Sequence, residues 1–439
     1  MASTADEQGV RELQRALYRA AKAEPGRRFH ALFDKVHRRD VLERAWKLVR
    51  ANAGAAGVDG QTINDVERYG VSRMLDELAQ DLRERRWRPA PARRVFIEKP
   101  GRVGELRPLS IPTVRDRVVQ AATKLVIEPV FEADFLPCSF GFRPKRSAHD
   151  ALQVLIDESW KGKRWVVETD IASCFEAIPH DQLMQAVRER IIDRRLLGLL
   201  RAMLGAGVMT DGTVTRHAAG TPQGGVVSPV LCNVYLHRLD RRWDDCDGVL
   251  VRYADDLLVM CRTWSQAERA LRALTAMLAD LGLAIKQAKT RIVQLHEGGD
   301  GVDFLGFHHR IVRVRNPRYR HVTFLARWPS RQKMQQARDR IRELTDRRRM
   351  LRPVEQVVRE INVFLRGFAE YFRYGNSSIK LAQINRYAAE RLALFVGKRH
   401  KHGRRYGWRE LVASPGRMGL INLSGTTVAP RPQVWRSRP

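Results

Sequence analysis

The sequence has few cysteines, a shortage of acidic residues and no long apolar run, and each shortage excludes a class of protein. Its five cysteines form no Cys-x-x-Cys pair, so neither a disulfide framework nor a cysteine zinc site is expected. No stretch reaches the roughly 18 apolar residues of a membrane span, and the N-terminus is polar and charged, unlike a signal peptide. We therefore expect a soluble cytoplasmic protein that does not contact a membrane.

Basic residues are abundant and unevenly placed. The 439 residues, enough for two or three domains, include 79 Lys plus Arg against 49 Asp plus Glu, a net charge of +30. Residues 311–439 hold 30 of these basic residues and 8 acidic ones, a net of +22. A basic surface kept for solubility explains a mild excess, whereas this concentration predicts a polyanionic partner such as nucleic acid.

The acidic residues that are present include two in an unexpected setting. Tyr253-Ala254-Asp255-Asp256 lies within the mostly apolar residues 250–260, where ionised carboxylates are costly unless a cation offsets them. Asp170 lies near the C-terminal end of another β-rich stretch, residues 166–171. Three carboxylates brought together by two strands would form an oxygen-only site that suits Mg²⁺. An Asp-Asp pair is also common turn chemistry, so the motif alone leaves both interpretations open.

A glycine-rich loop, Gly-Thr-Pro-Gln-Gly-Gly-Val-Val-Ser-Pro at residues 220–229, separates the two acidic segments. It opens a predicted helix and can bring backbone close to a ligand. Taken alone, the loop fits a plain strand-to-helix turn better than a ligand site.

The order of these segments resembles the palm of reverse transcriptases, and the finer pattern resembles the proteins encoded by group II introns. Other matching blocks run in the family's order. They are Gly-Val-Asp-Gly at 57–60, Arg-Pro-Leu-Ser-Ile-Pro at 107–112 continuing to 117, Ser-Phe-Gly-Phe-Arg-Pro at 139–144, Leu-Gly-Leu at 281–283 followed by Lys286, Lys289 and Thr290, and Val-Asp-Phe-Leu-Gly-Phe at 302–307.

The resemblance implies an α+β right-hand polymerase with fingers, a palm of antiparallel sheet and helices, and an α-helical thumb. The implied domains are an N-terminal helical extension (1–60), fingers (61–164), the palm with the carboxylates (165–310), a basic helical thumb, also called the maturase domain or domain X (311–425), and a C-terminal tail (426–439). The zinc-dependent endonuclease of many relatives is expected to be absent, and the DNA-binding segment absent or vestigial.

Apolar periodicity independently predicts several helices. A helix over 264–281 is indicated by a Ser265-x-x-Glu268 capping box and by Gly282 as its stop. Three amphipathic helices in the last third can share one core while their polar faces carry Arg and Lys. Their apolar positions are Met334, Ala337, Ile341 and Leu344; Val358, Ile361, Leu365, Phe368 and Phe372; and Leu381, Ile384, Ala388 and Leu392.

The resemblance also implies roles for individual residues. Asp170, Asp255 and Asp256 would hold two Mg²⁺ ions that act on the primer 3′ hydroxyl and the pyrophosphate, and Ile171 could add only its backbone carbonyl. Asp256 is the carboxylate that could act at longer range. Lys289 is the candidate that protonates the departing pyrophosphate, and Lys286 is its competitor.

Substrate contacts follow from the same resemblance. Phe175, five residues after Asp170, holds the family's position beneath the incoming sugar, where a ring excludes a ribose 2′-hydroxyl; the alternative is an ordinary core phenylalanine. Gln223 is expected to contact the nascent base pair or the template backbone. Lys99, Arg107 and Arg143 are candidates for the triphosphate, and a structural ion pair is the alternative for each.

The expected partners are intron RNA, an RNA template, a DNA primer or target site, and deoxynucleoside triphosphates. The basic residues proposed to bind RNA are Arg347, Arg348, Arg349, Arg366 and Arg373.

Three other function classes compete. An RNA-directed RNA polymerase typically has Gly-Asp-Asp and a small or polar residue at position 175. A splicing factor without polymerase activity would be free to lose the carboxylates. Reverse transcriptases of defence, CRISPR-associated or diversity-generating elements usually lack this basic thumb. We therefore expect an RNA-directed DNA polymerase that also acts as a maturase for its intron.

Overall fold

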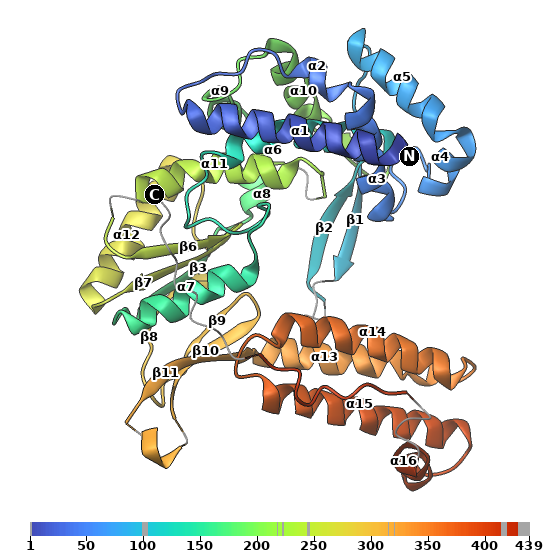
Figure 1. Cartoon of the computed structure of the whole chain (residues 1–439), viewed down its shortest axis with the longest axis vertical. Coiled ribbons are helices and arrows are strands. Elements are labelled where there is room, and N and C mark those ends of the chain that lie inside the picture. The colour runs from blue at the N-terminus through green and yellow to red at the C-terminus, as the bar shows by residue number, and fades with distance from the viewer. Residues whose placement is uncertain are drawn as a thin grey trace.

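The computed structural model describes residues 2–98, 104–216, 218–221, 224–243, 246–314, 316–319, 321–413 and 419–428. Two predicted site residues, Lys99 and Gln223, lie outside these ranges. The molecule is elongated, with N-terminal helices at one end, a central sheet, and a layer of C-terminal helices at the other end (Figure 1).

The N-terminal end is built around one helix that is buried on nearly all sides, α6 (Val114–Glu132). A helix that is apolar all round belongs in a core. Asp193 joins two parts of this region, because its carboxylate accepts hydrogen bonds from the backbone of Leu32 and Phe33 at 2.8 Å and also caps α10. The other helices of this region are α1 (Ala2–Ala23), α2 (Phe33–Val36), α3 (Arg39–Ala51), α4 (Ile63–Tyr69), α5 (Val71–Arg83), α9 (His180–Arg188) and α10 (Arg194–Gly205), of which α1, α2 and α3 pack against α6.

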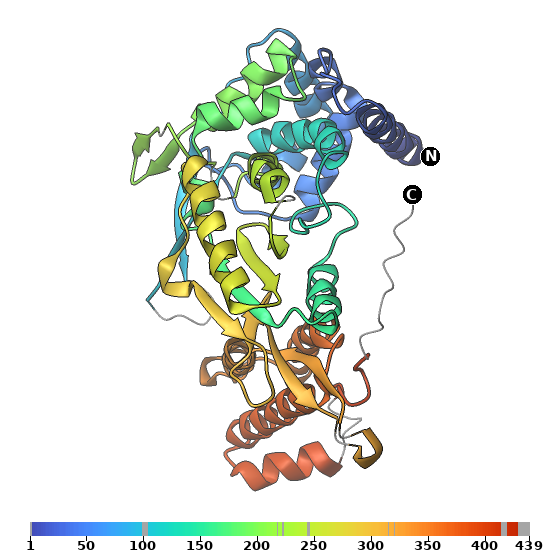
Figure 2. The same cartoon turned by 90° about the vertical axis from the view of Figure 1, so that its left-hand side faces the viewer.

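A four-stranded sheet extends from this region toward the C-terminal helices. β1 (Ala92–Glu98) pairs antiparallel with β2 (Leu106–Ile111) and parallel with β4 (Val208–Thr210), which continues into β5 (Thr213–Thr215). The β4–β5 hairpin projects from the side of the molecule (Figure 2). Residues 208–215 complete a sheet that begins with residues 92–111. This sheet therefore includes residues from both sides of residue 164, the predicted boundary between fingers and palm.

The central sheet is antiparallel, with the order β6-β7-β3-β8. Its strands are β3 (Trp165–Asp170), β6 (Val249–Tyr253), β7 (Asp256–Cys261) and β8 (Arg291–Gln294). Alternate side chains enter two different cores. Val167 and Val259 pack with the N-terminal helices in the first core, whereas Val166 and Leu258 pack toward the C-terminal helices in the second core. Burial on both faces explains why the hairpin sequence is mostly apolar.

Helices cover both faces of this sheet. On one face lie α11 (Ser228–Trp243) and α12 (Trp264–Asp280), and on the other lies α7 (Ala148–Trp160). The predicted capping box of α12 is wrong: Thr263 is the N-cap, and its side chain accepts from the Gln266 amide. Thr263 takes this position because the chain is extended there, whereas Ser265 already lies in the first turn. Gly282 follows the helix with φ +66°, as a helix stop requires.

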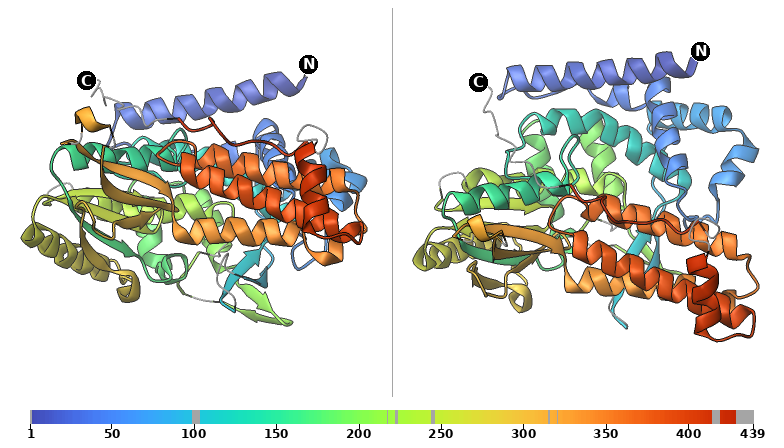
Figure 3. Two further views of the ribbon diagram at one scale, coloured as in Figure 1. Left: turned by 90° about the horizontal axis from the view of Figure 1, so that it is seen from below. Right: turned by 60° about the horizontal axis from the view of Figure 1, so that its bottom comes forward.

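The C-terminal region shares the second core with the palm sheet. A three-stranded sheet, β9 (Val302–Phe304), β10 (Phe307–Arg313) and β11 (Thr323–Pro329), crosses the predicted boundary at 310–311. The helices α13 (Arg331–Leu344), α14 (Val354–Phe372) and α15 (Ser378–Arg399) then lie side by side (Figure 3). Their predicted apolar positions are buried, except for the half-buried Phe368. The sequence pattern missed a fourth helix, α16 (Arg404–Ala413).

Within the described ranges, no helix combines the length and apolar character that a membrane span needs.

Candidate active site

Three carboxylates meet at one end of the palm sheet. Asp170 is the last residue of β3 and stands opposite Asp256, the first residue of β7. Asp255 lies in the turn between β6 and β7, after Ala254, whose φ is +58°. The Ile171 amide donates to the Asp255 carbonyl at 3.2 Å and so joins the β3 end to this turn. The strand pairing therefore explains how residues 85 positions apart in sequence reach one site.

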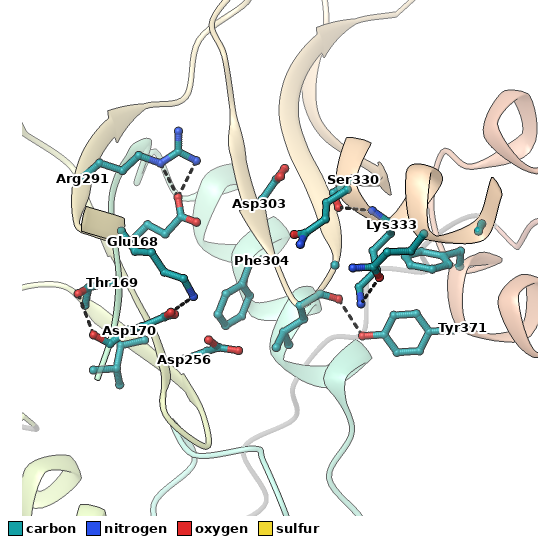
Figure 4. Close-up of a pocket in the computed structure, with 18 of the residues that line it drawn as sticks. Glu168, Thr169, Asp170, Asp256, Arg291, Asp303, Phe304, Ser330, Lys333 and Tyr371 are labelled. Atoms are coloured by element: carbon teal, nitrogen blue, oxygen red, sulfur yellow. Dashed lines mark hydrogen bonds and ion pairs between the residues drawn. The ribbon is translucent and has the colours of Figure 1, made fainter. Parts of the chain in front are cut away.

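These carboxylates face a cleft of about 830 Å³ that adjoins a second cavity of about 1090 Å³ next to the C-terminal helices. Asp170, Asp256 and Lys333 line both. Figure 4 shows Asp170 and Asp256 on the strand side, with Lys333 and Tyr371 across the cavity. The two cavities therefore form a continuous surface from the carboxylates to α13 and α14.

The surroundings shift the pKa of two of these carboxylates. Burial raises the pKa of Asp255. Burial, followed by repulsion from Asp255 and Glu168, raises the pKa of Asp256 to about 6. The Arg107 guanidinium opposes both shifts, which agrees with its place in the lining of the cleft. A bound cation would stabilise the ionised forms of these carboxylates.

Both lysine candidates reach the site. The Lys289 ammonium forms an ion pair with the Asp170 carboxylate. The backbone amide of Lys286 donates to the Asp170 carbonyl at 2.8 Å, and the side chains of both lysines line the cleft. The arrangement leaves both lysines as candidates for proton donation.

The donor set fits a hard divalent cation. Three carboxylates face one cleft, and oxygen ligands of this kind are the ones that Mg²⁺ prefers. Ile171, which lines the same cleft, has a hydrocarbon side chain, so its backbone carbonyl is the only ligand atom it could offer. Across the ranges described, no three His, Cys, Asp or Glu side chains are already gathered as a metal site. Asp170 is held by Lys289 instead, and metal binding would compete with that ion pair.

Phe175 also faces the cleft. It belongs to the short helix α8 (Cys174–Ala177) and is half-buried against the first core. Its ring meets that of Phe142 edge to face, with centroids 6.4 Å apart and an interplanar angle of 75°. Both rings line the same cleft as Asp255.

The prediction that Arg143 contacts the triphosphate is wrong, because Arg143 forms a structural ion pair, which was the alternative for this residue. Its side chain pairs with Glu132 at 2.8 Å and donates to the carbonyls of Leu136 and Ser139, both at 2.7 Å. It is 8% exposed and does not line the cleft. These contacts use up its donors, so Arg143 anchors a loop.

Arg252 is a site residue that sequence reasoning missed. It is fully buried in β6 and forms an ion pair with Asp240 of α11. Its guanidinium also donates to the Asn233 side chain at 3.0 Å and to the Ala254 carbonyl at 3.2 Å. Arg252 therefore stabilises the turn that carries Asp255. A lone arginine between buried apolar residues was the available sequence signal.

The basic residues proposed for RNA binding differ in their surroundings. Arg347 and Arg348 lie in the 3₁₀ turn η3 (Arg347–Arg349) and are not buried; the Arg348 side chain is 96% exposed. Arg366 is exposed on α14. Arg349 pairs with Glu360, and Arg373 pairs with Glu370 at 2.9 Å. These two are partly committed to the fold.

A palm sheet ending in three carboxylates, between a fingers-like sheet and a helical layer, has the right-hand arrangement of a nucleic-acid polymerase. Residues 97–309 match the reverse transcriptase (RNA-dependent DNA polymerase) family, and residues 334–411 match the group II intron maturase-specific domain. Divalent metals are generally used by the first family. The chain belongs to the group II intron type of reverse transcriptase and maturase. Its enzyme class is RNA-directed DNA polymerase.

Relatives support the same assignment. Protein YkfC of Escherichia coli is 34% identical over 349 residues, covering 70% of this chain and 89% of that protein. The group II intron-encoded protein LtrA of Lactococcus lactis is 34% identical over 48% of this chain and 35% of its own length. An uncharacterized 91 kDa protein in the cob intron of Schizosaccharomyces pombe is 29% identical over 61% of this chain. The chain spans 40% of that protein's length.

Proposed function

We propose that the palm cleft copies RNA into DNA with two Mg²⁺ ions, and that the basic C-terminal helices bind the intron RNA and assist its splicing. The observation that carries this proposal is the convergence of Asp170, Asp255 and Asp256 in one cleft of a chain that also matches a maturase domain. Template RNA, a DNA primer or target site and deoxynucleoside triphosphates are the remaining partners.

Asp170, Asp255 and Asp256 would hold the metal, with the Ile171 carbonyl as a further oxygen. When bound, Mg²⁺ supplies the positive charge that activates the primer hydroxyl and neutralises the phosphates. Without a cation, burial and the neighbouring carboxylates raise the pKa of Asp256 to about 6, so a cation that binds below that pH must displace a proton from this carboxyl group.

Basic residues of the chain would interact with the carboxylates, the pyrophosphate and the triphosphate. Lys289 holds the Asp170 carboxylate, and Lys289 or Lys286 donates a proton to the departing pyrophosphate. Arg107 faces the two other carboxylates and can grip a triphosphate oxygen. Phe175 selects deoxyribose by excluding a 2′-hydroxyl. Gln223 and Lys99 keep their predicted roles at the nascent base pair and the triphosphate.

Arg347, Arg348 and Arg366 are the exposed arginines through which the C-terminal region would contact RNA phosphates, with Arg349 and Arg373 beside them. A splicing factor without polymerase activity is the alternative. The carboxylates of Asp255 and Asp256 favour an active polymerase, because acids whose burial disfavours the ionised form are costly to keep without a use.

The direct test is extension of a DNA primer on an RNA template by the purified chain. We expect deoxynucleotides to be incorporated with Mg²⁺, incorporation to stop when EDTA removes the metal, and ribonucleotides to be used poorly. Preferential ribonucleotide incorporation would identify an RNA polymerase instead. Intron RNA binding without any extension would identify a splicing factor.

A further inference from the structure

Phe142 has an unusual backbone for an aromatic residue. Its φ is +57°, in the left-handed region that glycine and asparagine adopt more easily. Its side chain is 48% exposed, although it is large and apolar. Strain of this kind persists where the surroundings enforce it, often at functional sites. Phe142 lines the cleft that holds the three carboxylates.

The surroundings of Phe142 do enforce its conformation. The preceding loop is bonded to β6, since the Phe140 amide donates to the Arg252 carbonyl at 2.9 Å. The Gly141 carbonyl accepts from the Asn233 side chain at 2.8 Å. Gly141 also lies so close to the catalytic turn that a Cβ there would stand 2.4 Å from the Ala254 nitrogen. Arg143 fixes the other side through Glu132.

The ring held in this way meets Phe175. The edge-to-face contact at 6.4 Å joins the ring of Phe142, from a loop, to the ring of Phe175, from α8. Phe175 is itself presented by a left-handed turn, because Ser173 has φ +44°. Its carbonyl is fixed by the Thr221 amide at 2.6 Å. Two constrained segments therefore converge to place two aromatic rings in the same cleft as the carboxylates.

We propose that Phe142 is a positioning residue for sugar selection, whose ring braces Phe175 and holds it against the space that a ribose 2′-hydroxyl would need. This inference rests on the proposed role of Phe175. It explains why a strained, exposed phenylalanine occupies the cleft, since the core gains little from a ring that is half in solvent.

The test is Phe142→Gly, which removes the ring and also relieves the left-handed backbone. The ratio of kcat/KM for ribonucleotides to that for deoxynucleotides should rise by roughly 3- to 10-fold, the size expected from the loss of one aromatic pair contact. The melting temperature should stay equal or rise. A residue with a structural role alone would give no change in the ratio. Phe142→Asn, which tolerates the same backbone, should repeat the result if the glycine variant folds poorly.

Lys145→Gly is the matched control. Lys145 lies in the same loop, is exposed and has φ +59°, but it does not line the cleft. Its replacement relieves the same kind of strain and should leave the sugar ratio unchanged.

Phe175→Val and the double variant separate this inference from the proposed function. Phe175→Val should raise the ratio more than Phe142→Gly does, and adding Phe142→Gly to it should have no further effect. If Phe175→Val changes the ratio and neither Phe142 variant does, the bracing role is overturned while the sugar gate stands. Independent, additive effects would also overturn it. No change in any variant would overturn both roles, and a wild-type chain without extension would overturn the polymerase proposal itself.

Discussion

The palm cleft and the C-terminal helices place charged side chains in opposite settings. The cleft places Asp255 and Asp256 where burial raises both pKa values, whereas the C-terminal region exposes arginines such as Arg348 to solvent. The two regions nevertheless share one hydrophobic core that runs from the palm sheet through α13, α14 and α15. We therefore expect that catalysis and RNA affinity can be changed separately by surface and cleft substitutions, although the two regions share a core.

The largest effect should come from the acidic side of this comparison. Asp255→Ala or Asp170→Ala removes a ligand from ions that supply several kcal/mol of transition-state stabilisation, so extension should fall by roughly 10²- to 10⁴-fold. Single-turnover extension of an RNA-templated primer measures the loss. Asp280→Ala is the control, because Asp280 is exposed on α12, pairs with Arg242 and lies outside the cleft. Near wild-type extension by Asp255→Ala would show that the site is misplaced.

A second effect concerns stability, and it follows from the raised pKa of Asp256. A carboxyl group with a raised pKa favours the protonated folded state, so without metal the protein loses stability as pH rises from about 4 to about 6. Asp256→Asn removes this cost. The variant should be more stable than the wild type at pH 7 by up to about 3 kcal/mol, and the difference should vanish near pH 4. Urea unfolding in EDTA at several pH values measures it.

Magnesium provides the check on that result. A cation that binds the folded site stabilises it by mass action, so added Mg²⁺ should raise the stability of the wild type more than that of Asp256→Asn. Equal stabilisation of the two proteins would exclude Asp256 from the metal site.

A smaller effect is expected on the basic side. Arg347→Glu with Arg348→Glu should weaken binding to group II intron RNA roughly tenfold and reduce the log–log salt slope by about 0.7–0.9 for each lost phosphate contact. Arg349 is left in place because reversing it would break its pair with Glu360. Arg262→Glu with Arg272→Glu, two exposed arginines at α12, is the control. An unchanged salt slope in the Arg347 and Arg348 variant would place the RNA elsewhere.

The sequence predicted the structure best where a residue type in a given setting has few possible roles. Carboxylates in an apolar hairpin predicted the cleft, and the periodicity of α13, α14 and α15 predicted their buried faces. The prediction of the helix cap was wrong because Thr263 and Ser265 both fit the sequence pattern of a cap. Only the backbone conformation, which is extended at Thr263, decides between them. The local sequence does not show whether Arg143 and Arg349 meet a ligand or a glutamate, because the glutamate that pairs with each of them lies on a neighbouring helix. The strain at Phe142 likewise depends on contacts with β6 and α11.

The most direct test of the separation between the two regions is to measure primer extension and intron RNA binding on the same two proteins, Asp255→Ala and the Arg347→Glu, Arg348→Glu double variant. Extension should use a short pre-annealed RNA template, so that it does not require the intron. We expect Asp255→Ala to lose extension and keep its affinity for intron RNA, and the double variant to lose affinity and keep most of its extension. Equal loss of both activities in the double variant would contradict this account and would identify the C-terminal helices as a general clamp on the template.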